Sequence, residues 1–260
     1  RRKMGGAHPE NARRTRTVPG GARPDYPRGD DVSETSEPAA VPCTALLLGA
    51  TGLVGGHVLD LLLADPAYTR VTVLTRRPLA RMDSKLDQRT ADFDRLRDHE
   101  ISFVVNDVFC CLGTTIATAG SQEAFRRVDH DYVVEAARLA SEHGKRRFFV
   151  VTAAGANAQS RIFYNRVKGE TEAAIRALPL ETAVILRPSL LLGERTESRA
   201  GESVAQRVMP ALDWMLVGPM RRYRSIQAST VARAMVRLAR QGTQGVRVVE
   251  SDEIQQIGGA

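Results

Sequence analysis

A tyrosine and a lysine four residues apart are the side chains in this sequence best suited to acid–base chemistry. Tyr164 and Lys168 fall in residues 163–178, a predicted helix, and a spacing of four puts both on one helix face. An adjacent ammonium favours the phenolate, so Tyr164 could pass a proton to an oxygen that gains negative charge. Thr152, twelve residues earlier at the end of a predicted strand, could hold a substrate carbonyl. The alternative is a core tyrosine and an exposed lysine without chemistry.

A glycine-rich turn supplies the second constellation. Gly49, Gly52 and Gly55 form a GxxGxxG pattern between a short apolar run, residues 45–48, and a predicted helix over residues 53–64. In this context the first glycine permits a tight exit from the strand, the second lets the backbone approach a pyrophosphate, and the third lets the helix pack closely on the sheet. The N–H groups of the helix N-terminus attract phosphate. The pattern predicts dinucleotide binding; the alternative is a flavodoxin-like turn without a ligand.

Two arginines follow the second predicted strand, residues 71–74, and bear on the choice of cofactor. A site that prefers NAD would place Asp or Glu there to bind the ribose 2′-hydroxyl, whereas this chain has Arg76 and Arg77. A guanidinium can hold a 2′-phosphate through two hydrogen bonds and can stack on adenine. The position therefore favours NADPH or NADP, against the alternative of two solvated loop charges. Tyr164 and Lys168 are candidate cofactor contacts as well, since Lys168 can bond to the nicotinamide ribose.

The elements that must position these residues alternate along the chain from residue 44. Strands are expected at 45–48, 71–74, 88–92, 107–112, 147–152, 182–186 and 245–250. Helices are expected at 53–64, 123–143, 163–178, 203–216 and 229–240, the last with Ser229 as its N-cap. This alternation predicts an α/β fold with a doubly wound parallel sheet, a Rossmann NAD(P)-binding fold over residues 43–260, with 189–228 as a small C-terminal substrate lobe.

Residues 1–42 have a different composition. They hold eight basic and six acidic residues, many Gly and Pro, and almost no large aliphatic residues. Such a segment cannot bury enough apolar surface to offset the entropy of ordering, so we expect a disordered N-terminal tail. A nucleic-acid arm or an organelle-targeting stretch is an alternative role, although the acidic residues count against a transit peptide.

The composition of the whole chain restricts its class. Of its 260 residues, 43% are hydrophobic and 26% charged, which is typical of a globular protein. The net charge of +7 suggests an anionic partner but makes no strong case for nucleic acid. No apolar stretch is suited to a membrane span, and no Cys or His spacing fits a metal site.

The cysteines indicate the compartment. Cys43, Cys110 and Cys111 are odd in number, and two are adjacent, where an ordinary disulfide is strained. A reducing, cytoplasmic location is therefore expected.

Several motifs across residues 44–260 carry a family resemblance. They are Gly49-Ala50-Thr51-Gly52, Arg76-Arg77, Asp92-Phe93, Cys110-Cys111-Leu112-Gly113-Thr114-Thr115 with the two residues before it, Val128-Asp129-His130-Asp131-Tyr132-Val133, Gly155-Ala156, Tyr164 through Glu170, and Arg187-Pro188-Ser189-Leu190-Leu191. Through them the chain resembles the short-chain dehydrogenase/reductase superfamily, in its extended or atypical branch. More narrowly it resembles the Tat-interacting-protein (oxidoreductase HTATIP-like) family, in which the Cys-Cys-Leu-Gly-Thr-Thr segment is the specific motif.

The resemblance implies a Rossmann domain that holds NADPH, with Tyr164 and Lys168 as the active pair. It also implies the cofactor contacts, which are Thr51, Gly52, Leu53 and Val54 at the pyrophosphate, Arg76 and Arg77 at the 2′-phosphate, Leu112 and Gly113 between adenosine and nicotinamide, Leu191 beside the nicotinamide, Asp92 at adenine and Arg199 as a phosphate clamp.

Three departures from the family pattern put a complete catalytic tetrad in doubt. Thr152 replaces the more typical serine, Cys111-Leu112-Gly113 replaces the common Asn-Ala-Gly, and Asp129 lies near the place of the relay asparagine. Members of the family are also described as regulatory proteins that bind partner proteins.

Three functions are therefore compatible with the sequence. The first is an NADP(H)-dependent oxidoreductase that acts on a small-molecule carbonyl or alcohol, with Tyr164 as proton donor. The second is an NADPH-binding regulator with weak or no turnover that acts through protein partners. The third is a sugar-nucleotide epimerase or dehydratase on the same scaffold. The sequence leaves a monomer or a homodimer open.

Overall fold

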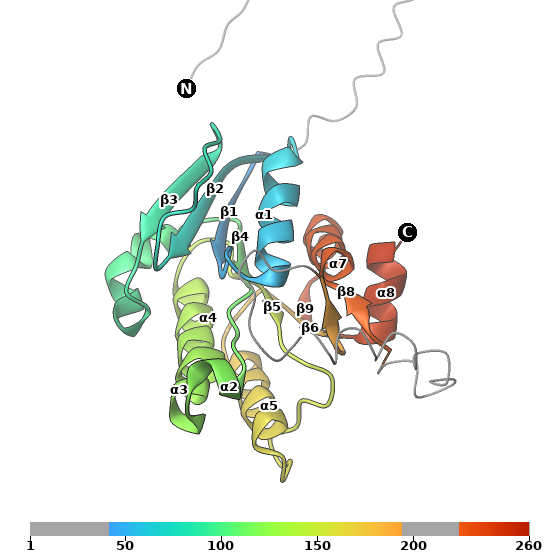
Figure 1. Cartoon of the computed structure of the whole chain (residues 1–260). Coiled ribbons are helices and arrows are strands. Elements are labelled where there is room, and N and C mark those ends of the chain that lie inside the picture. The colour runs from blue at the N-terminus through green and yellow to red at the C-terminus, as the bar shows by residue number, and fades with distance from the viewer. Residues whose placement is uncertain (1–41, 194–223, 260) are drawn as a thin grey trace, which may run out of the picture. The chain divides into compact units, whose positions relative to one another are not determined.

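The computed structural model describes residues 42–193 and 224–259, which all belong to one compact unit, Ala40–Ala260. Seven strands form one parallel sheet in the order β3-β2-β1-β4-β5-β6-β9 (Figure 1). The strands are β1 Cys43–Leu48, β2 Tyr68–Thr75, β3 Leu86–Thr90, β4 Asp107–Cys110, β5 Arg147–Val151, β6 Thr182–Arg187 and β9 Gly245–Glu250. This order is that of a doubly wound Rossmann sheet, so the predicted fold class is confirmed.

The strand order fixes where a ligand can bind. β1 pairs with β2 on one side and with β4 on the other, so the chain winds outward to β3 and then crosses back. In such sheets the crevice opens at the carboxyl ends of the strands, where the winding reverses. A ligand site is therefore expected at the carboxyl ends of β1 and β4.

Helices cover both faces of the sheet (Figure 1). One face packs against α1 Leu53–Ala64, α7 Ala228–Arg240 and α8 Ser251–Gly259, with Leu47, Phe109 and Phe149 pointing into that core. The other packs against α4 Tyr132–Glu142 and α5 Phe163–Arg176, with Leu46, Leu48 and Phe148. Neighbouring strand residues thus point to opposite cores, as in a sheet buried on both sides.

The long helix predicted over residues 123–143 is interrupted. It consists of α3 Gln122–Arg126, a π-helical turn η2 Arg127–Asp131, and α4. The apolar repeat predicts a buried face of Val128, Tyr132, Ala136 and Ala140. Ala136 and Ala140 are buried, whereas Val128 and Tyr132 are half-buried and their neighbours Asp129 and Val133 are buried instead. A π turn is rare and occurs mostly at functional sites, so Asp129, which lies in it, is a candidate functional residue.

Other elements are short or begin elsewhere than predicted. Ser229 does not cap its helix: α7 begins at Ala228, because β8 Ile226–Gln227 pairs with β7 Leu191–Leu192 and leads directly into the helix. No periodicity in the sequence predicted two further elements, the 3₁₀ helix η1 Phe93–Phe103 and the short helix α2 Ile116–Ala119. The expected helix 203–216, Arg199 and residues 1–41 lie outside the described residues, and the proposed lobe 189–228 is described only at its two ends.

A buried charge cluster lies at the amino ends of the strands. Asp107 and Arg147 begin β4 and β5 and are direct partners in the ladder, with Asp107 Oδ1 3.1 Å from Arg147 Nε. The Tyr68 hydroxyl donates a hydrogen bond of 2.7 Å to Asp107 Oδ2. Burial, together with the charge and the hydrogen bond of Asp107, raises the pKa of Tyr68 far above its usual value. This tyrosine therefore remains a neutral donor.

Candidate functional site

The glycine turn joins β1 to α1 with little free space. Gly49 has a φ of 85°, and a Cβ atom there would lie 2.5 Å from the carbonyl oxygen of Cys111. A Cβ on Gly55 would lie 2.0 Å from the carbonyl oxygen of Gly49. The tight exit from the strand and the close packing of the helix thus both need glycine.

The N-terminus of α1 is suited to bind phosphate. Thr51 and Gly52 are exposed, and the N-cap, Gly52, provides no side-chain hydrogen bond. The first-turn N–H groups have no carbonyl partners within the helix and carry its positive dipole end. This exposed, uncapped helix end beside a glycine cradle fits the pyrophosphate of a dinucleotide.

The two arginines after β2 are open to a ligand. Arg76 and Arg77 are both exposed, and no described residue forms an ion pair with either. The Thr75 hydroxyl donates to the Arg77 carbonyl oxygen at 2.8 Å, which fixes the turn that carries them. Asp92 follows β3 on the same side of the sheet, is exposed, and accepts a 3.0 Å hydrogen bond from the N–H of Asp94.

The loop after β4 is held by a buried carboxylate. Asp129 Oδ2 accepts a 2.9 Å hydrogen bond from the backbone N–H of Thr114. A Cβ on Gly113 would lie 3.5 Å from Asp129 Oδ1 and 4.0 Å from Lys168 Nζ. The structure thus brings Gly113, predicted to line the cofactor path, to the predicted active lysine.

Lys168 forms a buried ion pair with Asp129. The distance between Nζ and Oδ1 is 2.7 Å, and the side chains are 5% and 1% exposed. The short distance and the burial of both groups make this a tight pair of opposite charges. Burial lowers the pKa of Lys168, but the charges of Asp129 and Tyr164 outweigh it, and the net shift is upward. Lys168 is therefore an ammonium at neutral pH.

Tyr164 lies in the first turn of α5 and is half-buried. Its ring packs against Phe125, with ring centroids 5.4 Å apart. Among residues 42–193 and 224–259, none forms a hydrogen bond with its hydroxyl. The phenol is thus available to a substrate, one helical turn from the ammonium.

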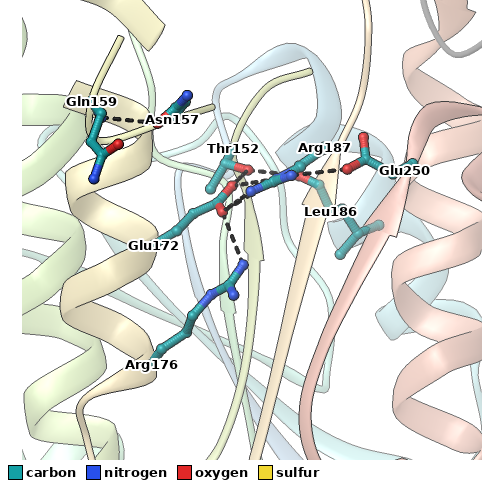
Figure 2. Close-up of polar contacts among 8 residues, drawn as sticks. All are labelled: Thr152, Asn157, Gln159, Glu172, Arg176, Leu186, Arg187 and Glu250. Carbon is teal, nitrogen blue, oxygen red and sulfur yellow. Dashed lines mark hydrogen bonds and ion pairs between the residues drawn. The ribbon is translucent and has the colours of Figure 1, made fainter. Parts of the chain in front are cut away.

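Thr152 lies at the end of β5 but its hydroxyl has other partners. It donates to Glu172 Oε1 at 2.7 Å and lies 3.2 Å from the carbonyl oxygen of Leu186 (Figure 2). A substrate carbonyl would need this hydroxyl to change its hydrogen-bond partner. The proposed role of Thr152 is therefore the one that the geometry favours least.

Glu172 belongs to a network that the sequence analysis missed. Arg187 donates to it through Nη2 at 2.6 Å and Nε at 2.9 Å, and reaches Glu250 through Nη1 at 2.9 Å (Figure 2). These hydrogen bonds, led by that to Glu172, raise the pKa of Arg187 above its usual value. The signal in the sequence is spacing: Tyr164, Lys168 and Glu172 follow one another at intervals of four.

The chain after β6 returns to the glycine turn. Leu191, in β7, and Leu53 both pack against the same core. A Cβ on Gly193 would lie 2.9 Å from Leu53 Cδ1. The chain two residues after Leu191 thus reaches Leu53, whereas Arg199 lies outside the described residues.

Comparison with known families and proteins gives consistent matches. The family described as NAD(P)H-binding matches residues 49–241. Protein HTATIP2 of Rattus norvegicus is 34% identical over 220 residues, which cover 83% of this chain and 89% of that protein. The mitochondrial protein FMP52 of Candida albicans is 37% identical over 213 residues, which cover 78% and 90%. Both matches span nearly the whole of the relative.

Solved structures of lower identity share the fold. MoeE5 in complex with UDP-glucose and NAD superposes with a TM-score of 0.61 at 15% identity, covering 83% of this chain and 80% of that one. The UDP-N-acetylglucosamine 4-epimerase of Methanobrevibacter ruminantium has a TM-score of 0.60 at 14% identity, covering 81% and 77%.

Proposed function

The chain belongs to the NAD(P)H-binding, atypical short-chain dehydrogenase/reductase family of HTATIP2 and FMP52, and from that premise we propose that it is an NADP(H)-dependent oxidoreductase acting on a carbonyl or alcohol. A nicotinamide dinucleotide follows from the family; the preference for NADP and the Tyr–Lys chemistry are our proposal. The observation that supports it is the Tyr164 hydroxyl, which has no hydrogen-bond partner among the described residues and lies one turn from the buried Lys168 ammonium, beside Gly113.

The described residues fit the cofactor along the carboxyl edge of the sheet. Gly49 and Gly55 allow the tight turn and the close helix packing that present the N-terminus of α1, where Gly52 and the backbone of Thr51 to Val54 would bind the pyrophosphate. The other contacts we propose are Arg76 and Arg77 to the 2′-phosphate, Asp92 to adenine, Leu112, Gly113 and Leu191 along the path to the nicotinamide, and Arg199 as a phosphate clamp. When bound, the nicotinamide supplies or accepts the hydride.

The protein's own part in the reaction is proton transfer and positioning. Tyr164 would donate its proton to the carbonyl oxygen as that oxygen gains charge, and Lys168 would stabilise the resulting phenolate. General acid catalysis of this kind contributes about 10²–10⁴-fold to rate. Because the Thr152 hydroxyl donates to Glu172, a role for it requires that it change partner when substrate binds.

The decisive test is turnover by Tyr164→Phe. NADPH oxidation is measured with a panel of aldehydes, ketones and quinones. We expect the variant to lose about 10²–10⁴-fold in kcat, because the proton donor is removed, with NADPH affinity unchanged. Tyr132→Phe is the matched control, since that hydroxyl binds Asp94 on the exterior. Retained turnover in Tyr164→Phe would exclude this tyrosine as the acid.

Cofactor preference is tested at the arginines. We expect Arg76→Ala to weaken NADPH binding by about 10- to 150-fold, the loss of one charge-assisted contact of about 1.5–3 kcal/mol, and to leave NADH binding unchanged. Arg70→Ala, an exposed arginine of the same strand, is the control. Equal wild-type affinities for NADPH and NADH by calorimetry would contradict the preference.

A regulatory function is the second candidate, because the Thr152 hydroxyl is already bonded to Glu172. In that case wild type oxidises NADPH with no compound of the panel, while bound nucleotide changes the capture of protein partners. An epimerase has only the shared fold in its favour.

Among the described helices, none is long and apolar enough to cross a membrane. The expected cytoplasmic location stands beside relatives whose names call them mitochondrial, and imaging of the full chain decides between them.

A further inference from the structure

Asp129 is buried, and removing a carboxylate from water has a large free-energy cost. Its side chain is 1% exposed and lies in a π-helical turn, the one irregular turn between α3 and α4. A buried carboxylate is retained only when paired charges and hydrogen bonds compensate the loss of water. Its partners therefore show what the residue does.

The three polar contacts of Asp129 tie its π turn to two other segments, α5 and the loop after β4. Oδ1 pairs with Lys168 on α5, Oδ2 accepts from the N–H of Thr114 in the loop after β4, and the Asp129 carbonyl oxygen accepts from the Thr171 hydroxyl at 3.0 Å. We propose that Asp129 is a positioning residue that holds the Lys168 ammonium charged and in place, and that ties it to the loop predicted to line the cofactor path. This proposal rests on the proposed function for its catalytic meaning.

The surroundings of Lys168 support an electrostatic role. The charged and titratable groups that act on it are Asp129 from the π turn, Tyr164 from its own helix and Cys110 from β4. Burial raises the pKa of the Cys110 thiol to about 12, so it stays neutral. Tyr164 is neutral when it acts as proton donor. Asp129 is thus the one described group that supplies a full negative charge to Lys168 at neutral pH.

The charge of Asp129 favours the protonated form of Lys168, so the Lys168 ammonium would release its proton at lower pH without it. Asp129→Asn is the appropriate change, because it removes the charge and nearly preserves the volume.

The experiment follows Lys168 itself and needs no turnover. The ¹³C resonances of the lysine side chains are titrated by NMR in the full-length protein, and the Lys168 signal is assigned by its absence in Lys168→Met. We expect the Lys168 midpoint to fall by about one pH unit or more in Asp129→Asn. Asp131→Asn, two residues on and paired with His130 on the exterior, should leave it unchanged.

A second measurement separates positioning from folding. If Asp129→Asn is too unstable, the double variant Asp129→Asn with Lys168→Met, which removes both buried charges, should recover stability, and a double variant no more stable than Asp129→Asn would overturn the proposed pairing. An unchanged Lys168 midpoint in folded Asp129→Asn would overturn the proposal. A shifted midpoint in a protein without turnover would support it and refute the oxidoreductase function. With turnover, the alkaline limb of the kcat/KM profile should shift in the same direction.

Discussion

Two ion pairs, each with a buried carboxylate, lie at opposite ends of the sheet and are built alike. At the amino ends of the strands, Asp107 pairs with Arg147; at the carboxyl ends, Asp129 pairs with Lys168. In each, one carboxylate oxygen faces the cation, and the other accepts from a neutral donor. Each cluster also contains a tyrosine.

The difference lies in what the tyrosine contacts. Tyr68 donates to the carboxylate of its cluster, which keeps it neutral and occupied. At the other end a backbone N–H takes that place, and Tyr164 lies beside the cation with its hydroxyl unpartnered by any described residue. The amino-end cluster is therefore suited to stability and the carboxyl-end cluster to chemistry.

Breaking the amino-end pair should have the largest effect on stability. Arg147→Met leaves Asp107 buried without its cation, and we expect the free energy of unfolding to fall by about 3–5 kcal/mol. NADPH affinity of the folded protein should not change. Arg95→Met, which breaks an exposed ion pair with Asp98, is the control, with a change within about 0.5 kcal/mol. A folded Arg147→Met protein that fails to bind nucleotide would remove the contrast between the two ends.

The two tyrosines should respond in opposite ways to loss of the hydroxyl. Tyr68→Phe removes a hydrogen bond to a buried carboxylate and should cost about 1.5–3 kcal/mol of unfolding free energy, with turnover unaffected. Tyr164→Phe should leave the melting temperature unchanged while abolishing turnover. Denaturant titrations of both variants, with NADPH oxidation assayed in parallel, test the pair. The contrast is lost if Tyr164→Phe is the less stable of the two.

Alkaline pH should destabilise the protein through Tyr68. Because its pKa is raised in the folded state, the native protein keeps a proton that the unfolded chain releases above about pH 10. Its contribution is thus present below that pH and lost as pH rises. We expect the stability difference between wild type and Tyr68→Phe to shrink by about 1.4 kcal/mol per pH unit above pH 10. Parallel stability curves would show that the phenol ionises normally.

Gly113→Ala should have the smallest effect on stability. Its new methyl would sit in ordinary contact with Asp129 Oδ1 and Lys168 Nζ, so the free energy of unfolding should change by no more than about 0.5 kcal/mol. Dinucleotide affinity should nevertheless fall, because the loop backbone can no longer approach the ligand closely. Unchanged NADPH affinity in Gly113→Ala would place the cofactor path elsewhere.

The sequence predicted the frame of the carboxyl-end site. Short apolar strands alternating with helices gave the sheet, and helix α1 and strand β9 lie at the expected residues. The roles of Gly49 and Gly55 depend on local geometry, which a strand–turn–helix motif imposes, and both agree with the contacts found.

The contacts that determine the chemistry could not be predicted from local sequence patterns. A period of 3.6 residues predicted one helix over 123–143, and nothing local indicated that Asp129 would be buried in a π turn. Its burial depends on Lys168 and Thr114, which are close only after folding. The bond between Thr152 and Glu172 is likewise tertiary, so the spacing that suggested a substrate contact could not reveal a competing partner.

The alternation of charge along α5 also fixes that helix in one register. Lys168 and Glu172 occupy successive turns, and each is held by a different neighbour, Asp129 for the first and Arg187 for the second. Sliding the helix by one turn, about 5.4 Å, would set Glu172 against Asp129, acid facing acid. Such a shift would break both ion pairs together, so a register shifted by one turn is unfavourable. Tyr164 inherits this fixed position, since it projects from the same rigid helix.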